Sequence, residues 1–193
     1  MSEENGAAEP GSLSTQRLVL RRWRASDAVE LAALAGQAAG GREGEEIADA
    51  RGWIARARVQ EEAATYVVAL GGAASAIGAC ALAPAAEAPS RREVGIWIGE
   101  AFSGRGYATE ALQVLIDWSF AGEGPEQLWG VCRVTNARAR RVMEKCGFQF
   151  RESGMARSVV LRGAVPVERF VLEKRNWLSL KAWGAGARAG AAA

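Results

Sequence analysis

The sequence predicts an α+β fold with a mixed, mainly antiparallel central sheet of six to seven strands and about four helices on both faces. Two observations carry this prediction. Three strand-like segments follow one another between residues 65 and 99, and successive strands joined by short turns pair antiparallel. The chain has 193 residues, 49% of them hydrophobic, and can therefore bury a sizeable core in one domain. The elements expected in chain order form a β-α-α-β-β-β-α-β-α-β series.

The first segments predict one strand followed by two helices. "RLVLRRW", residues 17–23, alternates apolar and basic side chains, which is typical of a strand with one solvent-facing side. Ser26-Asp27 can cap a helix that runs from Ala28 to about Gln37. A second helix is expected from about Glu45 to Glu62. Its buried side is predicted to hold three residues: Ile47, Ile54 and Val59.

A long uncharged segment, residues 63–86, has the length of a membrane span. It is mostly Ala and Gly, however, with Gly71-Gly72 in its middle and Pro84 near its end. A β-hairpin of "TYVVAL" and "AIGACAL" joined at the glycines therefore fits better, and we expect a soluble protein. "REVGIWIG", residues 92–99, is the third consecutive strand expected.

The second half of the chain predicts helices that alternate with strands. A helix is expected to end near Phe120, followed by a strand over "QLWGVCRV". A short basic helix from Asn136 to Lys145 stops before Gly147, which takes the C′ position, and "VERFVLEK" predicts the last strand. The buried face of the first of these helices is predicted to hold Ala108, Ala111, Leu112, Leu115 and either Trp118 or Ser119.

The chain is expected to form one domain, residues 15–183, between two flexible tails. Residues 1–14 are polar and acidic, without the basic start and apolar run of a signal peptide. Residues 184–193 are low in complexity and offer little to pack. We therefore expect neither tail to contribute to the core.

Composition excludes several classes of function. A net charge of +2 gives no electrostatic footprint for nucleic acid. Three cysteines without a CxxC spacing indicate neither a disulfide framework nor a zinc site, and they favour a reducing, cytoplasmic setting. Histidine is absent, so the commonest general base and metal ligand is missing. Catalysis would have to use carboxylates, tyrosine, thiol, backbone amides or water, and no metal, membrane or nucleic-acid partner is expected.

The segment "FSGRGYATEAL", residues 102–112, has the features of an anion-binding loop. It lies between a predicted strand and a helix N-terminus, where backbone amides are unpaired and the helix dipole is positive. Gly104 and Gly106 allow close approach of a ligand, and Arg105 adds a positive charge. The segment lacks the Gly-Lys-Ser/Thr of a P-loop and the third glycine of a dinucleotide fingerprint. A plain turn that leads into a helix is the alternative.

The residues from Glu93 to Leu112 resemble motif A of the GNAT superfamily of acyl-CoA N-acyltransferases. The loop matches the pattern [QR]-x-x-G-x-[GA] of that motif except that Ser103 replaces Gln or Arg. The sequence is most similar to the RimJ/RimL-like ribosomal-protein alanine acetyltransferases. Three further segments resemble that subfamily in the right order: "RLVLRRWRASDAVEL", "VTNARARRVMEKCGF" and "VPVERFVLEKRNW". Together the similar segments cover about residues 15–177.

This resemblance implies a GNAT fold and an N-acetyltransferase that moves an acetyl group from acetyl-CoA to a primary amine, by direct attack in a ternary complex. The pyrophosphate of CoA would lie on the loop amides, and the pantetheine arm would pair with residues 96–98. Asn136 would hydrogen-bond near the pantetheine, although an N-cap role explains it equally well. Arg141, or less favourably Arg140, would meet the 3′-phosphate; the alternative is a solvated helix face paired with Glu144. The implied donor-binding residues are Ile96, Trp97, Ile98, Ser103, Gly104, Arg105, Gly106, Tyr107, Ala108, Thr109, Asn136 and Arg141.

Catalytic groups are less clearly marked. Glu93 is our candidate general base, acting directly or through a water, with Glu100 as the runner-up; the alternative for Glu93 is a solvated strand end beside Arg91 and Arg92. A helix-dipole role is expected for Glu110. Ala139 stands where the family usually has a Ser that helps to protonate the leaving thiolate, so water or Tyr107 would supply that proton. An α-amine, with a pKa of about 7.7–8.0, needs less help from a base than a lysine amine at about 10.4.

Several alternatives stay open. The acceptor is a protein N-terminal amine or a small-molecule amine, including an aminoglycoside. An aminoglycoside would need a carboxylate-lined cleft, which four acidic residues could supply unless they are ordinary helix surface: Glu43, Glu45, Glu46 and Asp49. The protein could instead be a non-catalytic acyl-CoA-binding module. An acyl-cysteine at Cys132 is less favoured than a core role, and Trp53 and Trp97 could line an acceptor pocket or simply be core residues. The sequence fits either a monomer or a homodimer.

Overall fold

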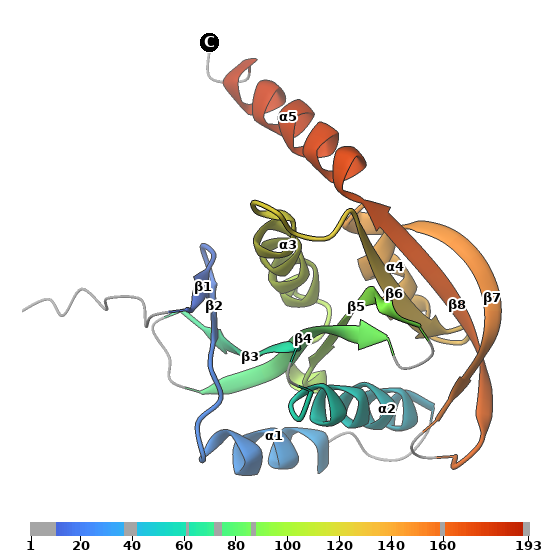
Figure 1. Ribbon diagram of the computed structural model, residues 1–193. Coiled ribbons are helices and arrows are strands. Elements are labelled where there is room, and N and C mark those ends of the chain that lie inside the picture. The colour runs from blue at the N-terminus through green and yellow to red at the C-terminus, as the bar shows by residue number, and fades with distance from the viewer. Residues whose placement is uncertain are drawn as a thin grey trace, which may run out of the picture.

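The computed structural model describes residues 11–36, 42–60, 62–71, 75–85, 88–158 and 161–190. In these ranges the chain forms one eight-stranded sheet and five α-helices (Figure 1). The elements are β1 (Leu13–Ser14), β2 (Leu18–Arg21), α1 (Asp27–Gly36), α2 (Arg42–Ala57), β3 (Ala64–Leu70), β4 (Ala76–Ala85), β5 (Ala88–Ile98), the 3₁₀-helix η1 (Glu100–Phe102), α3 (Tyr107–Phe120), β6 (Gln127–Arg133), α4 (Ala137–Lys145), β7 (Gln149–Arg157), β8 (Ala164–Glu173) and α5 (Lys174–Gly190).

The sheet has the order β1-β2-β3-β4-β5-β6-β8-β7. Only β5 and β6 pair in parallel among the described strands, and every other neighbouring pair is antiparallel. The predicted α+β fold with a mixed, mainly antiparallel sheet is therefore confirmed. The count of six to seven strands was low by at least one, because β1 and β7 were not predicted.

The two unpredicted strands are weakly marked in the sequence. β1 is only two residues long and pairs with β2 through Leu13 and Ser14. Its presence corrects the expectation that residues 1–14 form a tail, of which residues 1–10 lie outside the described ranges. β7 is an edge strand whose residues are mostly exposed, so it lacks the apolar alternation that marks a half-buried strand.

Two hydrophobic cores lie on the two faces of the sheet. The alternation of side chains along a strand sends Val94 and Ile98 to the face covered by α3 and α4, and Trp97 to the face covered by α1 and α2 (Figure 1). Leu112 and Leu115 of α3 are fully buried in the first core. The second core, beneath α1 and α2, is smaller and includes several alanines.

The helix patterns were correct in place but not in every boundary. α2 ends at Ala57, about five residues earlier than predicted. Ile54 is buried as expected, but Val59 lies beyond the helix and is 86% exposed; the side chain of Ile47 lies outside the described set. On α3, Ser119 and not Trp118 completes the buried face.

Helix α5 follows β8 directly and extends away from the sheet (Figure 1). Trp177 in its first turns is buried, and its indole donates a hydrogen bond to Asp117 of α3 at 2.8 Å. The backbone remains helical to Gly190, which corrects the expected tail over residues 184–193 up to that residue. No described helix is long and apolar enough to cross a membrane.

The parallel pair β5–β6 is short, and this creates the most important feature of the sheet. Residues 92–94 of β5 pair with residues 128–130 of β6. Beyond these pairs β5 continues to Ile98, still paired with β4, and β6 continues to Arg133, still paired with β8. Within the described residues, the edges of residues 95–98 and 131–133 that face each other are therefore without a strand partner.

Candidate functional site

The loop after β5 takes its shape from two glycines. Helix η1 leads into residues 103–106, and α3 begins at Tyr107. Gly104 and Gly106 have φ angles of +76° and +82°, a left-handed conformation that costs a residue with a Cβ atom about 1–2 kcal/mol. A Cβ on Gly104 would meet no atom within 4 Å. Glycine is therefore required there by backbone conformation and not by lack of space.

The loop presents a set of unpaired backbone amides. The first hydrogen bond of α3 runs from the amide of Glu110 to the carbonyl of Gly106, at 3.0 Å. Among the described residues, the amides from Gly104 to Thr109 donate to no protein acceptor. Because these donors lie at the positive end of a 14-residue helix, the loop is suited to bind an anion. The Arg105 side chain on it is exposed.

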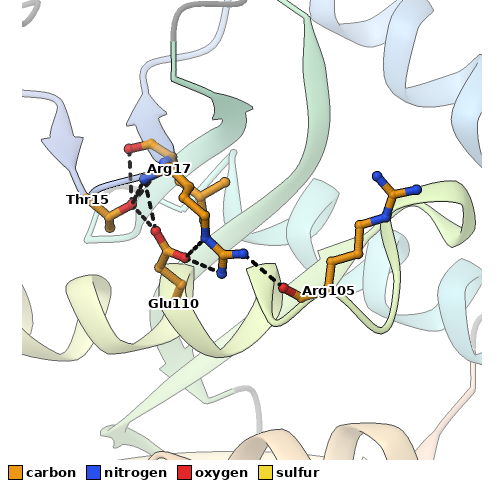
Figure 2. Close-up of polar contacts among 5 residues, drawn as sticks. Thr15, Arg17, Arg105 and Glu110 are labelled. Carbon is orange, nitrogen blue, oxygen red and sulfur yellow. Dashed lines mark hydrogen bonds and ion pairs between the residues drawn. The ribbon is translucent and has the colours of Figure 1, made fainter.

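A polar cluster holds this loop against the turn between β1 and β2 (Figure 2). The Arg17 guanidinium donates to the Glu110 carboxylate at 2.7 Å through Nε, and to the carbonyl of Arg105 at 3.1 Å through Nη1. The Thr15 hydroxyl donates to the same carboxylate at 2.5 Å. Burial raises the pKa of Glu110, but the hydrogen bonds from Thr15 and Arg17 outweigh it and hold the pKa below its ordinary value. From the sequence, Glu110 was expected only to interact with the helix dipole, and neither Thr15 nor Arg17 was predicted as its partner.

The divergence of β5 and β6 lies beside this loop. Residues 96–98 form the end of β5 that faces the gap, directly before Gly99 and η1. Ile96 is half-buried on the α3 side of the sheet, whereas Trp97 is buried on the α2 side. On that side Trp53 of α2 packs over Gly95, where a Cβ would come within 2.3 Å of its ring. Trp53 and Trp97 thus act mainly as packing residues, although the buried indole nitrogen of Trp97 has no hydrogen-bond partner among the described residues.

Asn136 follows β6 and begins α4. Its side-chain oxygen accepts a hydrogen bond from the amide of Ala139 at 2.8 Å, which confirms the N-cap alternative. Ala139 is half-buried against the first core and carries no hydroxyl. Gly147, at φ +84°, lies just beyond the C-cap Cys146, as the sequence predicted.

The two arginines of α4 have different environments. Arg140 forms an ion pair with Glu168 of β8 at 2.6 Å, so the expected pairing with Glu144 is wrong for this residue. Arg141 is exposed and forms no ion pair with another described residue. Of the two, Arg141 is the one whose charge is available to a ligand.

Glu93 and Tyr107 lie on opposite faces of the sheet. Glu93 is half-buried, pairs in register with Ala83 and Trp129, and alternates with Val94 onto the α2 side. Tyr107 packs against the first core, and the Arg17 guanidinium lies 4.8 Å above its ring. Glu100, the alternative base, is exposed in η1.

A second polar cluster lies on the α2 side of the diverging strands. Arg133 at the end of β6 forms an ion pair with Asp49 of α2, and Ser158 at the end of β7 hydrogen-bonds both side chains. This cluster was not predicted, because it joins residues that lie 84 and 109 positions apart in the sequence. Asp49 is therefore partly neutralised, and the side chains of Glu43, Glu45 and Glu46 lie outside the described set.

The cysteines are buried. Cys132 lies in the first core, and burial raises the pKa of Cys146 to about 12. Because the thiolate is the reactive form of cysteine, this burial does not favour an acyl-cysteine. Within the part of the chain that the structure describes, no group of carboxylates and thiols is arranged to hold a metal ion.

The mixed sheet, the diverging strands and the amide-lined loop define an acyl-CoA-dependent acetyltransferase. Residues 17–149 match the family described as acetyltransferase (GNAT) domain, and the chain belongs to this family. No curated protein matches the chain at the sequence level.

Several solved structures share the fold. A GCN5-related N-acetyltransferase from Brucella melitensis is 22% identical, with a TM-score of 0.68 over 90% of this chain and 83% of that chain. A Vibrio cholerae protein assigned as a ribosomal-protein-serine acetyltransferase is 24% identical, with a TM-score of 0.64 over 84% and 97%. The microcin C7 self-immunity acetyltransferase MccE, solved with acetyl-CoA and AMP, is 16% identical, with a TM-score of 0.64 over 82% and 93%.

Proposed function

We propose that the protein acetylates a primary amine by direct attack on acetyl-CoA in a ternary complex, and that its preferred acceptor is an α-amine such as a protein N-terminus, as in the RimJ/RimL-like enzymes. The observation that carries the proposal is the row of unpaired amides from Gly104 to Thr109 beside the divergence of β5 and β6. The unpaired amides can hold a pyrophosphate. The gap between β5 and β6 can receive an extended chain with alternating amides and carbonyls.

The donor would bind across both features. The pyrophosphate lies on the loop amides, with Arg105 adding charge, and the pantetheine lies along residues 96–98 as an added strand. Asn136 caps α4 through its oxygen, which leaves its amide group to donate toward the pantetheine. The exposed Arg141 guanidinium is the group proposed for the 3′-phosphate.

The reaction needs a neutral amine on the α2 side of the gap. Its nitrogen attacks the thioester carbonyl carbon, so that a C–N bond forms, and the C–S bond then breaks to release the CoA thiolate. A backbone amide of β5 stabilises the oxyanion. Glu93, on the α2 side, takes the proton from the amine through a water; water or Tyr107, on the α3 side, returns a proton to the thiolate.

The acceptor preference follows from chemistry that the chain lacks. Without histidine, the enzyme has no side chain that ordinarily titrates near neutral pH, and an α-amine is already partly neutral there. The pairing of Asp49 with Arg133 leaves less free negative charge for a polycationic aminoglycoside. The likeness to the Vibrio cholerae protein is in line with a peptide N-terminus.

Release of free CoA thiol from acetyl-CoA over a panel of amines tests the proposal. The panel would contain peptides with free Ser or Ala N-termini, the same peptides with blocked N-termini and one internal lysine, and an aminoglycoside. We expect release with the free N-termini and at least tenfold less with the blocked peptides. Tight CoA binding without release on any amine would instead indicate a binding module, an outcome that Ala139 makes worth testing.

A further inference from the structure

We infer that Arg17 is a positioning residue for the donor site: with Thr15 and Glu110 it forms an anchor that holds the loop of residues 103–109 in its anion-binding shape. The inference rests on the proposed function, because it assigns a task to residues that lie next to the CoA loop. We call these three residues the loop anchor (Figure 2).

Arg17 fixes the orientation of one peptide group of the loop. Arg17 donates through Nη1 to the carbonyl oxygen of Arg105 at 3.1 Å. In a planar trans peptide, the carbonyl and the following N–H point in opposite directions. By holding the Arg105 carbonyl toward itself, Arg17 directs the N–H of Gly106 away from itself. Because Gly106, at φ +82°, tolerates other backbone conformations, the loop needs such a restraint to keep this orientation.

Several contacts hold the Arg17 side chain itself in place. Both its Nε and its Nη2 meet Oε2 of Glu110, at 2.7 and 2.5 Å, and its backbone amide donates to Oε1 at 3.2 Å. The Thr15 hydroxyl satisfies the same Oε1, and the Tyr107 ring lies 4.8 Å beneath the guanidinium. The Arg17 side chain is 47% exposed, so a single ion pair would hold it weakly. Several restraints together fix its position.

Arg17 also neutralises the negative charge of Glu110 beside the loop amides. Glu110 lies in the first turn of α3, next to the amides that would bind a pyrophosphate. An unpaired carboxylate there would repel the phosphates, and the Arg17 guanidinium neutralises it. The Arg105 side chain is exposed, forms no hydrogen bond or ion pair with another described residue, and stays available to the ligand. The loop anchor thus joins the β1–β2 turn to the first turn of α3, 93 residues away in the sequence. Binding of CoA to the loop is therefore linked to the order of the β1–β2 turn.

The test compares two conservative substitutions with a matched control. Arg17→Lys keeps the charge but loses the planar fork that reaches Glu110 and Arg105 together. Glu110→Gln removes the charge and one strong acceptor. Arg175→Lys is the control, because Arg175 also forms an exposed ion pair, with Glu173 at 2.5 Å, but on α5 and β8. For each protein, CoA binding is measured by calorimetry and acetyl transfer by steady-state kinetics.

We expect Arg17→Lys and Glu110→Gln to weaken CoA binding and raise the KM for acetyl-CoA about tenfold, the size of a lost charged hydrogen bond. The kcat and the acceptor KM should change less than twofold, a split that general loss of stability would not produce. CoA should slow hydrogen exchange of residues 13–20 in the wild type and less so in Glu110→Gln. Unchanged CoA affinity in both variants, or an equal loss in Arg175→Lys, would overturn the anchor. No CoA binding by the wild type would overturn the proposed function itself.

Discussion

The Arg133 guanidinium of β6 forms an ion pair with the Asp49 carboxylate of α2, across the side of the sheet where the amine is proposed to enter. Their side chains are 11% and 20% exposed, and Ser158 donates to the carboxylate at 3.0 Å while accepting from Arg133 at 2.9 Å. The pair therefore fixes α2 relative to the ends of β6 and β7.

Loss of this pair should lower stability. Asp49→Asn removes the negative charge that faces the Arg133 guanidinium in a largely buried place, so we expect the free energy of unfolding to fall by about 2 kcal/mol. Urea denaturation at pH 7 measures it. Arg133→Met combined with Asp49→Asn should lose less than the two single changes added together. Simple additivity would show that the two side chains do not interact.

Substitution of the candidate base should slow the chemical step. We expect Glu93→Gln to lower kcat about 100-fold at pH 7 without changing the affinity for CoA, because the amide cannot take the proton of the amine. Raising the pH should recover part of the rate, since more of the amine is then neutral. Glu100→Gln, tested beside it, should have little effect. If Glu100→Gln were the slower variant, the base would be assigned to Glu100.

The left-handed glycine at the start of α3 should be required for donor binding. Gly106→Ala must place a Cβ at φ +82°, which costs about 1–2 kcal/mol and displaces the loop. We expect CoA to bind at least tenfold more weakly. Gly122→Ala is a matched control, because Gly122 has φ +58° and open space around its Cβ position, in the turn after α3. It should cost similar stability and leave CoA affinity intact; equal loss of CoA affinity in both variants would contradict the loop assignment.

The buried pair of Arg21 and Asp27 should make the protein sensitive to acid. Arg21 donates to both carboxylate oxygens at 2.7 and 2.8 Å, and these bonds hold the pKa of Asp27 below its ordinary value of 3.8. The native state therefore binds this proton less readily than the unfolded state. The resulting stability is complete above about pH 5 and is lost as the pH falls below 4, through the lowered pKa.

Asp27→Asn should remove this dependence. We expect a loss of about 3 kcal/mol at pH 7, because the buried guanidinium of Arg21 loses the carboxylate charge that accepts two of its hydrogen bonds. Denaturation midpoints measured from pH 6 to pH 2.5 should fall less steeply in the variant than in the wild type. Parallel curves would mean that other carboxylates cause the acid sensitivity.

The cap of α4 should be separable from any contact with the donor. Asn136→Asp keeps the side-chain oxygen that accepts from Ala139 but removes the amide group, so stability should be nearly unchanged while CoA binds more weakly. Asn136→Ala should lose both the capping oxygen and the amide group, so that stability falls by about 1 kcal/mol and CoA binds more weakly. Thermal unfolding and CoA titration distinguish these effects. Equal CoA affinity in all three proteins would leave Asn136 with the cap alone.

Sequence patterns predicted the centre of the fold because burial there is regular. Residues 65–70 and 76–82 are nearly all buried and lie on either side of Gly71-Gly72 in the sequence. β3 was therefore placed to within one residue, whereas β4 continues past the predicted end to Ala85. Asn136 and Gly147 marked the ends of α4 because both roles are local. Val59 shows the limit of such patterns: it fits a helical spacing, but α2 ends at Ala57 and the Val59 side chain is exposed among the described residues.

The contacts that shape the site were not predictable in the same way. The glycine loop was found from its sequence because it is a contiguous segment with a required backbone conformation. Two pairs are brought together by the tertiary structure alone, because their members lie 93 and 84 residues apart in the sequence: Arg17 with Glu110, and Arg133 with Asp49. One sequence holds no periodicity that connects such pairs, and each of the four also fits an ordinary solvated position.

The short parallel contact between β5 and β6 gives the sheet a mechanical character. Among the described residues, the two strands are joined only by the pairs of residues 92–94 with 128–130. The sheet therefore has two halves, β1–β5 and β6–β8, and the three residue pairs between β5 and β6 act as a hinge between them. A small rotation about these three pairs changes the distance between residues 95–98 and residues 131–133 more than it changes the pairs themselves. A ligand strand bound in the gap would pair with both halves of the sheet. We therefore expect the sheet of the unliganded protein to be more flexible than that of the donor complex.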